Sequence, residues 1–83
     1  MRQIVFSDHA RAKMEERGIP QERAISVLRE GRHQEARRGR MAARAVAQGI
    51  DTEVICAAEG DTIVVVTCYD EKGPDWRPVV RLE

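Results

Sequence analysis

Long apolar runs are absent from this sequence, and so are the patterns of several common enzyme classes. No stretch approaches the roughly 18 consecutive apolar residues that a membrane-spanning helix needs. The opening MRQIVFSDHA lacks the apolar core of a secretory signal. No phosphate-binding P-loop, dinucleotide-binding glycine pattern or GxSxG nucleophile elbow occurs. We therefore expect a cytoplasmic domain with no membrane partner.

Aromatic residues and cysteines are also scarce. One Phe, one Tyr and one Trp are too few for a platform on which nucleic-acid bases stack. Cys56 and Cys68 lie inside apolar runs, which predicts buried free thiols in a reducing compartment, with a single disulfide as the alternative. Together with His9 and His33 they show no zinc-site spacing such as CxxC or HxxxH. We expect neither a metal nor another cofactor.

Size and charge limit what the chain can be. A chain of 83 residues is expected to form one domain over residues 1–83, although the final Leu82-Glu83 pair is of the kind that an expression vector adds. The net charge is zero, yet residues 1–50 hold eleven Lys and Arg against six Asp and Glu, and residues 51–83 hold three against eight. This asymmetry predicts an anionic partner bound by one face, with ordinary solvated charge as the alternative.

Two helices are predicted in the first half of the chain. Ser7 is a good N-cap for a helix over Asp8–Arg17, which contains no proline, glycine or β-branched residue and stops before Gly18. A second helix over Gln21–Glu30 follows Pro20. Its apolar residues repeat at spacings of three and four, a core-facing pattern: Ala24, Ile25 and Leu28, with Val27 at the edge of the stripe.

The second half is predicted to form a sheet. The candidate strands are 33–38 as an exposed edge, 41–48, 52–58, 62–69 and, after a turn at 72–74, 76–82. Residues 52–58 and 62–69 should form an antiparallel hairpin around Gly60, and 63–66 are apolar on both faces, as in a central strand. The predicted class is α+β, with two N-terminal helices followed by four or five antiparallel strands. We expect five apolar residues to be mostly buried: Ile25, Leu28, Val54, Val64 and Val66.

Three cationic residues share one face of the first predicted helix. His9, Lys13 and Arg17 are spaced by four, so they form a stripe of roughly 12 Å that suits an anion. The helix dipole favours a neutral imidazole at His9, which could act as a base near neutral pH. The alternative is a solvated face paired with Glu16.

Thr67 and Tyr69 are the hydroxyl residues near the end of the predicted central strand. A spacing of two places both side chains on one face of the sheet. They could meet a ligand at the rim of the sheet. The alternative is that Thr67 is a good strand former and Tyr69 a rim aromatic.

The order of these motifs resembles a known family. Residues 6–10, 13–14 and 17–19 resemble F-S-x-H-A-x-x-R-M-x-x-R-G-I, the opening of the domain of unknown function 4258 family. Residues 65–69 (VVTCY) resemble its V-V-T-V-Y. At two positions the sequence departs from the family pattern: Lys13 replaces an arginine and loses the bidentate fork, and Pro20 replaces a Ser or Thr cap.

The resemblance implies both a fold and an activity. The family is similar to RelE-like and barnase-like toxin ribonucleases, whose helices precede an antiparallel sheet (ααββββ). It implies a bacterial toxin–antitoxin endoribonuclease that cleaves RNA without a metal, with an antitoxin or another protein as partner. The catalytic candidates are His9 as acid or base, Arg17 as charge stabiliser and Tyr69 as second proton donor. The candidates for RNA or phosphate binding are Lys13, Arg44 and Thr67.

A non-catalytic protein-interaction module is the alternative function. Such a domain would share the fold and bind a partner through its helical hairpin. The zero net charge favours this interpretation, because ribonucleases of the toxin type are usually basic. The RNA target, the protein partner and the oligomeric state are not defined by the sequence.

Overall fold

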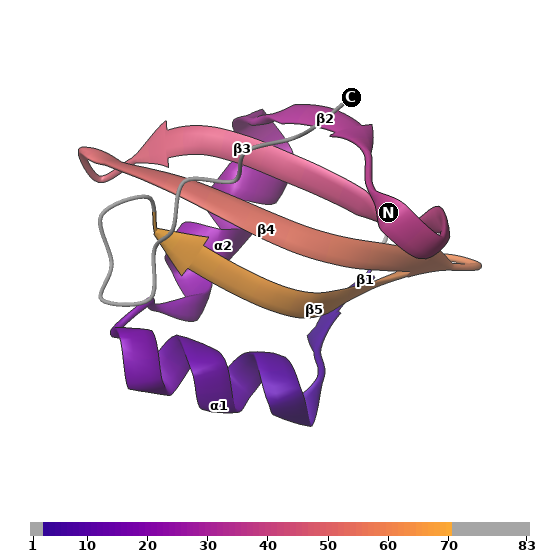
Figure 1. Cartoon of the computed structure of the whole chain (residues 1–83), viewed down its shortest axis with the longest axis horizontal. Helices are drawn as coiled ribbons and strands as arrows, with labels where there is room; N and C mark the ends of the chain where they lie inside the picture. Colours follow the sequence, from indigo (N-terminus) through magenta and orange to yellow (C-terminus); the bar gives the residue numbers. More distant parts are fainter. Residues whose placement is uncertain (1–2, 71–83) are drawn as a thin grey trace.

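Two helices and a five-stranded mixed sheet form the computed structural model, which describes residues 3–70 (Figure 1). The elements are β1 (Gln3–Phe6), α1 (Asp8–Arg17), α2 (Gln21–Glu30), β2 (Arg32–Glu35), a 3₁₀ helix η1 (Arg37–Gly39), β3 (Met41–Ala47), β4 (Ile50–Glu59) and β5 (Thr62–Asp70). The strand order is β1-β5-β4-β3-β2. The predicted α+β class is confirmed. No helix among these residues is long and apolar enough to span a bilayer.

Both helices have the predicted bounds. The Ser7 side chain accepts a hydrogen bond from the backbone N–H of Ala10 at 3.0 Å, which satisfies one of the free donors of the first turn of α1. Gly18 ends α1 in the left-handed conformation, with φ 69° and ψ 34°, where glycine avoids the steric cost of a Cβ. Pro20 begins α2 without a side-chain cap.

Gly31 is required by crowding at the junction of α2 and β2. Its φ of −80° is available to any residue, but a Cβ there would lie 2.5 Å from the Val27 carbonyl oxygen and 2.7 Å from that of Arg44. Both atoms belong to the backbone and cannot move aside. The absence of a side chain therefore lets α2 turn directly into the edge strand.

The N-terminal strand corrects the predicted topology. β1 pairs in parallel with β5, with Ile4 opposite Ile63 and Phe6 opposite Val65, so the sheet is mixed and the prediction of an entirely antiparallel sheet was wrong. β1 has only four residues and no turn joins it to its partner, so no local signal marks it. The pairing does confirm that β5 is central, because β5 lies between β1 and β4.

The other predicted strands are confirmed within a few residues. β3, β4 and β5 pair antiparallel in sequence order, and Gly60 and Asp61 form the turn between β4 and β5. β2 is an edge strand whose four residues are all exposed. The predicted turn at 72–74 and strand at 76–82 lie outside the described residues.

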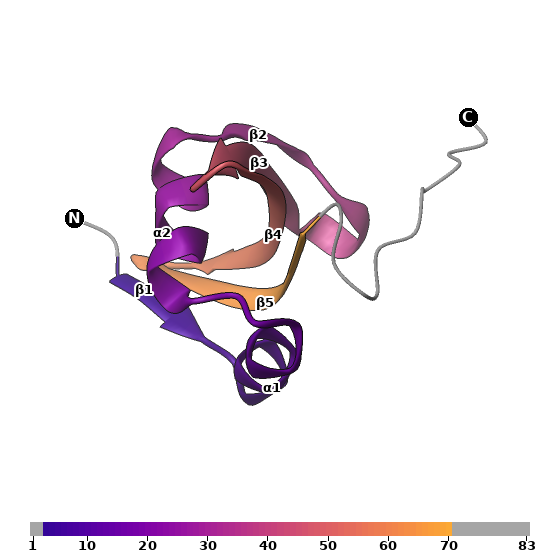
Figure 2. The ribbon, with the colours of Figure 1, turned by 90° about the vertical axis from the view of Figure 1, so that its left-hand side faces the viewer.

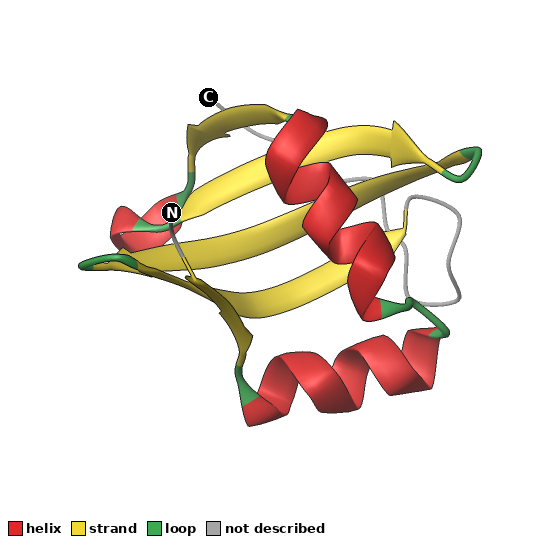
Figure 3. Ribbon diagram, turned by 180° about the vertical axis from the view of Figure 1, so that it is seen from behind, coloured by secondary structure: helices red, strands yellow, loops and turns green. Residues whose placement is uncertain are grey.

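The helices cover one face of a strongly curved sheet. Figure 2 shows the sheet curling around α2, and Figure 3 shows both helices on the same side. α2 packs on β3 and β4, and α1 packs beside β5. The core between the layers contains Ala10, Met14, Ile19, Ala24, Val27, Leu28, Ala43, Val54, Cys56, Val65 and Cys68. We call the opposite side of the sheet, which faces the viewer in Figure 1, the outer face.

A β-bulge in β5 decides which valines enter this core. Cys56 pairs with Val65 but Ile55 pairs with Thr67, so Val66 is an extra residue, and the side-chain alternation shifts there. Val65 and Cys68 are consequently buried. Of the predicted core, Leu28 and Val54 are buried, whereas Ile25, Val64 and Val66 are only partly buried. Val27, predicted at the edge of its stripe, is fully buried instead.

Cys56 and Cys68 are free and buried, which confirms the prediction of two buried thiols that form no disulfide. Burial, with a smaller contribution from the Asp70 carboxylate, raises the pKa of the Cys68 thiol from 9.0 to about 12, while Arg23 and Arg17 act in the opposite direction. A thiol that stays protonated is a poor nucleophile. Cys68 therefore belongs to the core of the sheet.

The raised pKa of Cys68 predicts a loss of stability in alkali. Because the thiol ionises more easily in the unfolded chain, its contribution is complete below pH 9.0 and disappears as the pH rises toward about 12. Urea midpoints measured from pH 7 to pH 11 should therefore fall more steeply for the wild type than for Cys68→Ala. Parallel pH profiles of the two proteins would contradict this prediction.

Candidate functional site

Four polar residues form a row across the outer face of the sheet. Arg32 of β2 is opposite Arg44 of β3, Arg44 is opposite Glu53 of β4, and Glu53 is opposite Tyr69 of β5. Directly opposite residues point to the same side of a sheet, so the four side chains share one face. We call these four residues the cross-strand row.

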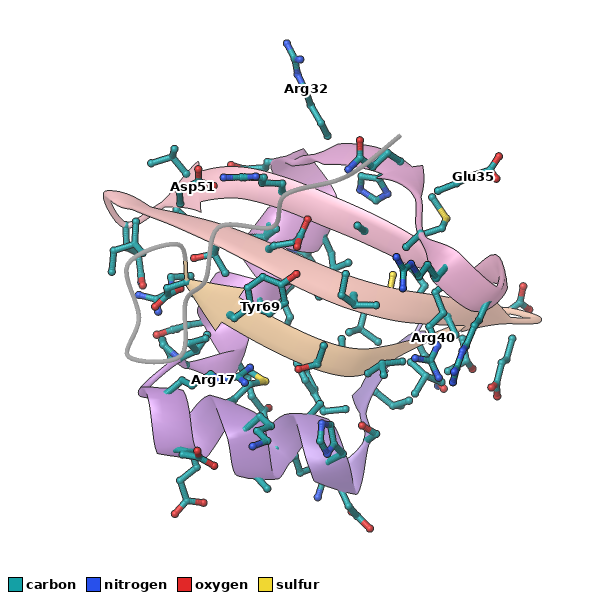
Figure 4. All side chains as sticks on the ribbon, in the orientation of Figure 1. Arg17, Arg32, Glu35, Arg40, Asp51 and Tyr69 are labelled. Atoms are coloured by element: carbon teal, nitrogen blue, oxygen red, sulfur yellow. The ribbon has the colours of Figure 1, made fainter. Side chains whose placement is uncertain are left out.

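Tyr69 is held at the end of the row by contacts from two directions. Its hydroxyl donates a hydrogen bond to the Glu53 carboxylate. The Arg17 guanidinium lies over the Tyr69 ring at 6.0 Å from the centroid, within the range of a cation–π contact. In Figure 4, Arg17 extends from α1 toward Tyr69. The structure thus brings together two of the residues that the sequence proposed as catalytic candidates.

Arg17 also stabilises the end of β5. Its Nη1 donates to the carbonyl oxygen of Cys68 at 2.9 Å. β1 pairs with β5 only as far as Val65, and α1 then runs beside the rest of the strand. The guanidinium therefore provides a hydrogen bond to the Cys68 carbonyl oxygen, which lies beyond the last residue of β5 that pairs with β1. It also orients the Tyr69 ring.

Arg44 is bound by the carboxylate of Asp51 on the same face. Its Nε and Nη2 donate to the two oxygens of Asp51 at 3.0 and 2.9 Å, a bidentate geometry. Asp51 precedes Glu53 by two residues, so both acids lie on the outer face. The Arg44 side chain is 53% exposed, which leaves it within reach of a ligand on this face.

The other predicted site residues lie apart from the row. His9 is exposed on the first turn of α1, about 12 Å along the helix axis from Arg17. Lys13 is 3.6 Å from the Glu16 carboxylate, which agrees with the alternative of a solvated, ion-paired face. Thr67 is partly buried opposite Ile55, on the same face as Tyr69, so the shared face of the two hydroxyls is confirmed.

Comparisons with known proteins identify the chain at the level of family. The model of a domain of unknown function, DUF4258, matches residues 6–70. The chain belongs to this family. Among curated proteins and solved structures, neither comparison finds a match. The matched range of the DUF4258 domain includes the whole cross-strand row and Arg17.

On the inner face of this DUF4258 domain, an ion pair anchors the end of β5. Nη2 of Arg23 lies 2.6 Å from Oδ2 of Asp70, and the Thr52 hydroxyl donates to Oδ1 at 2.7 Å. Arg23 is 6% exposed and Thr52 fully buried. Among the described residues, Nε of Arg23 is buried without a hydrogen-bond partner, and the Asp70 carboxylate offsets part of the cost of burying the charge. The pair fixes the strand that carries Tyr69.

Glu53 and Arg32 are the members of the row that were not among the site residues predicted from the sequence. The tight turn pairs Glu59 with Thr62. If the register of the hairpin continued from this pair without interruption, Thr52 would lie opposite Tyr69. The bulge at Val66 shifts the register by one residue and brings Glu53 there instead. A valine-rich strand contains no signal for a bulge, so the DUF4258 sequence alone does not predict the pair.

Proposed function

We propose that this domain binds RNA and cleaves it without a metal, in the manner of RelE-like and barnase-like toxin ribonucleases. The observation that supports the proposal is the position of Glu53. Glu53 stands between Tyr69 and Arg44 in the cross-strand row, its carboxylate accepts a hydrogen bond from the Tyr69 hydroxyl, and Arg17 lies over the Tyr69 ring. A base, a proton donor and two cations are the groups that such a cleavage needs.

The reaction would use the RNA itself as nucleophile. Glu53 removes the proton of a ribose 2′-hydroxyl, and the oxygen attacks the adjacent phosphorus. Tyr69 donates its proton to the 5′-oxygen that leaves, which gives a 2′,3′-cyclic phosphate and a new 5′-hydroxyl. Arg17 and Arg44 stabilise the charge on the five-coordinate phosphorus.

Glu53 takes the role of base that the sequence assigned to His9. An acid and a base that act on one phosphate both need hydrogen-bond reach to it. His9 and Arg17 are separated by two turns of α1, whereas Glu53 and Tyr69 are in contact. In this proposal His9 and Lys13 contact flanking phosphates, and Thr67 contacts the nucleotide beside Tyr69.

A non-catalytic protein-interaction module is the second candidate. The observation that favours it is that polar groups of the row, and Arg17 beside it, already bind neighbours inside the domain. Arg44 is bound to Asp51, Arg17 to the Cys68 carbonyl, and Tyr69 to Glu53. Such a network is also what a rigid binding surface would have.

An RNA-cleavage assay with purified protein tests the first candidate. We expect single-stranded RNA to be cut to products with 2′,3′-cyclic phosphate ends at the same rate with and without EDTA. DNA and 2′-O-methyl RNA of the same sequence should stay intact, because they lack the nucleophile. Failure of the folded wild-type protein to cut a mixed-sequence RNA pool would support the interaction module instead, and cleavage that EDTA abolishes would contradict the metal-independent mechanism.

A further inference from the structure

The β2 edge of the sheet carries an excess of positive charge. Residues 29–40 contain five arginines against two glutamates. Four of the arginines are exposed, at the end of α2, in β2 and in η1. We call these four the arginine edge: Arg29, Arg32, Arg37 and Arg38.

Three cations elsewhere in the described chain form ion pairs, whereas the four arginines of the edge form none. Lys13, Arg23 and Arg44 lie 3.6, 2.6 and 2.9 Å from Glu16, Asp70 and Asp51, respectively. Within residues 3–70 no such ion pair involves the four arginines of the edge. Their charge is therefore available to an anion from outside, and guanidinium groups match phosphate oxygens bidentately.

The geometry of the edge suits a linear polyanion. From Arg32 to Arg37 the chain is extended through β2, a span of roughly 17 Å at about 3.3 Å per residue. Figure 4 shows the Arg32 side chain extending away from the sheet into open space. At the far end, Arg38 has a φ of 63°, which is uncommon for a residue other than glycine.

The edge is continuous with the cross-strand row. Arg32 belongs to both, because it is directly opposite Arg44, which is opposite Glu53. A strand lying along β2 would therefore have Glu53 within two strand spacings, or about 10 Å, of its backbone. Arg44 lies between Arg32 and Glu53. Because its guanidinium is already bound to Asp51, we expect Arg44 to contribute less to phosphate binding than the arginine edge does.

We infer that the arginine edge binds the phosphate backbone of RNA and presents the strand to Glu53. The identity of the ligand as RNA rests on the proposed function, whereas the position of the binding surface rests on the unpaired charges. The main phosphate contacts then come from these arginines, rather than from Lys13 and Arg44.

Binding can be measured apart from cleavage. The probe is a fluorescent 12-nucleotide 2′-O-methyl RNA, which cannot be cut, in anisotropy titrations at several salt concentrations. We expect Arg32→Gln/Arg38→Gln to weaken binding at least 10-fold and to reduce the slope of log K against log salt by roughly 0.7 per arginine. Glu35→Gln, which removes a negative charge from β2, should tighten binding.

The matched control is Arg11→Gln. Arg11 is exposed on α1, away from the edge, and its substitution changes the net charge by the same amount as Arg32→Gln. It should alter the dissociation constant less than two-fold, and circular dichroism should show unchanged melting for all of these variants. Equal losses of affinity for Arg11→Gln and Arg32→Gln would overturn the inference, because the net charge alone would then govern binding.

The two proposals fail in different ways. If the wild type binds the probe through the arginine edge but cuts no RNA, the edge stands and the cleavage proposal falls. If RNA is cut normally by Arg32→Gln/Arg38→Gln, cleavage stands and the edge is wrong. The inference would also be overturned, in favour of a protein partner, if the wild-type protein did not bind the RNA probe but bound an acidic peptide through these arginines.

Discussion

Asp70→Ala is expected to lower the free energy of unfolding by about 3–5 kcal/mol. The substitution leaves the Arg23 guanidinium, only 6% exposed, without its counter-ion. Nε of Arg23 already has no partner, and the buried Thr52 hydroxyl loses its 2.7 Å acceptor. The free energy of unfolding of a folded protein is about 0.05–0.15 kcal/mol per residue. For a chain of 83 residues, the expected loss is therefore a large part of the total stability.

Urea denaturation followed by circular dichroism measures the loss of stability in Asp70→Ala. Two further variants serve as controls. Asp51→Ala removes a carboxylate from the exposed Arg44 and should cost only about 0–1 kcal/mol, since water can solvate the guanidinium left behind. Arg23→Met/Asp70→Leu removes both buried charges and should recover most of the loss of Asp70→Ala. A loss below about 1 kcal/mol for Asp70→Ala would show that water reaches Arg23, contrary to its burial in this structure.

Local signals explain the parts of the fold that the sequence predicted. The bounds of α1 follow from a cap at Ser7 and a left-handed stop at Gly18, and both act within a few residues. The β4–β5 hairpin follows from two strands rich in β-branched residues around a turn at Gly60. Each of these interactions lies within one element or one turn, so a single sequence contains the information.

Non-local pairing explains the parts that were missed. The partner of β1 is β5, which follows α1, α2 and three further strands in the chain, and the four residues of β1 resemble many unstructured segments. The extra residue Val66 is one of four consecutive apolar residues that fit either face. A shift of one residue exchanges the two faces of a strand, so Val64 and Val66 are only partly buried and Val65 enters the core in their place.

The same distinction applies to the candidate site. Arg17, Thr67 and Tyr69 were chosen because helix stripes and strand alternation are periodic, and Arg44 because it lies in the basic half of the chain; the structure places all four on or beside the outer face. Glu53 could not be chosen in this way, because the bulge determines its pairing with Tyr69. Sequence periodicity therefore identified the face of the site but not its central carboxylate.

Glu53→Gln should reduce RNA cleavage by a factor of about 10²–10⁴, the usual contribution of a general base. The amide keeps the size of the side chain and still offers an oxygen to the Tyr69 hydroxyl, so the row should remain assembled. It cannot accept the proton of the 2′-hydroxyl at neutral pH. Single-turnover cleavage at saturating enzyme isolates this step from binding, and affinity for uncleavable RNA should stay within about two-fold of the wild type.

Two variants decide whether Glu53 itself carries the chemistry. Glu59→Gln makes the same substitution on β4 at an exposed position beside the turn, outside the row, and should cleave at the wild-type rate. His9→Ala should lose at most about 10-fold, because His9 lies two turns of α1 from Arg17 and only contacts flanking RNA in this mechanism. If His9→Ala instead lost 10²–10⁴ while Glu53→Gln remained active, the base would be the imidazole, and the Tyr69–Glu53 pair would serve to hold β4 and β5 in register.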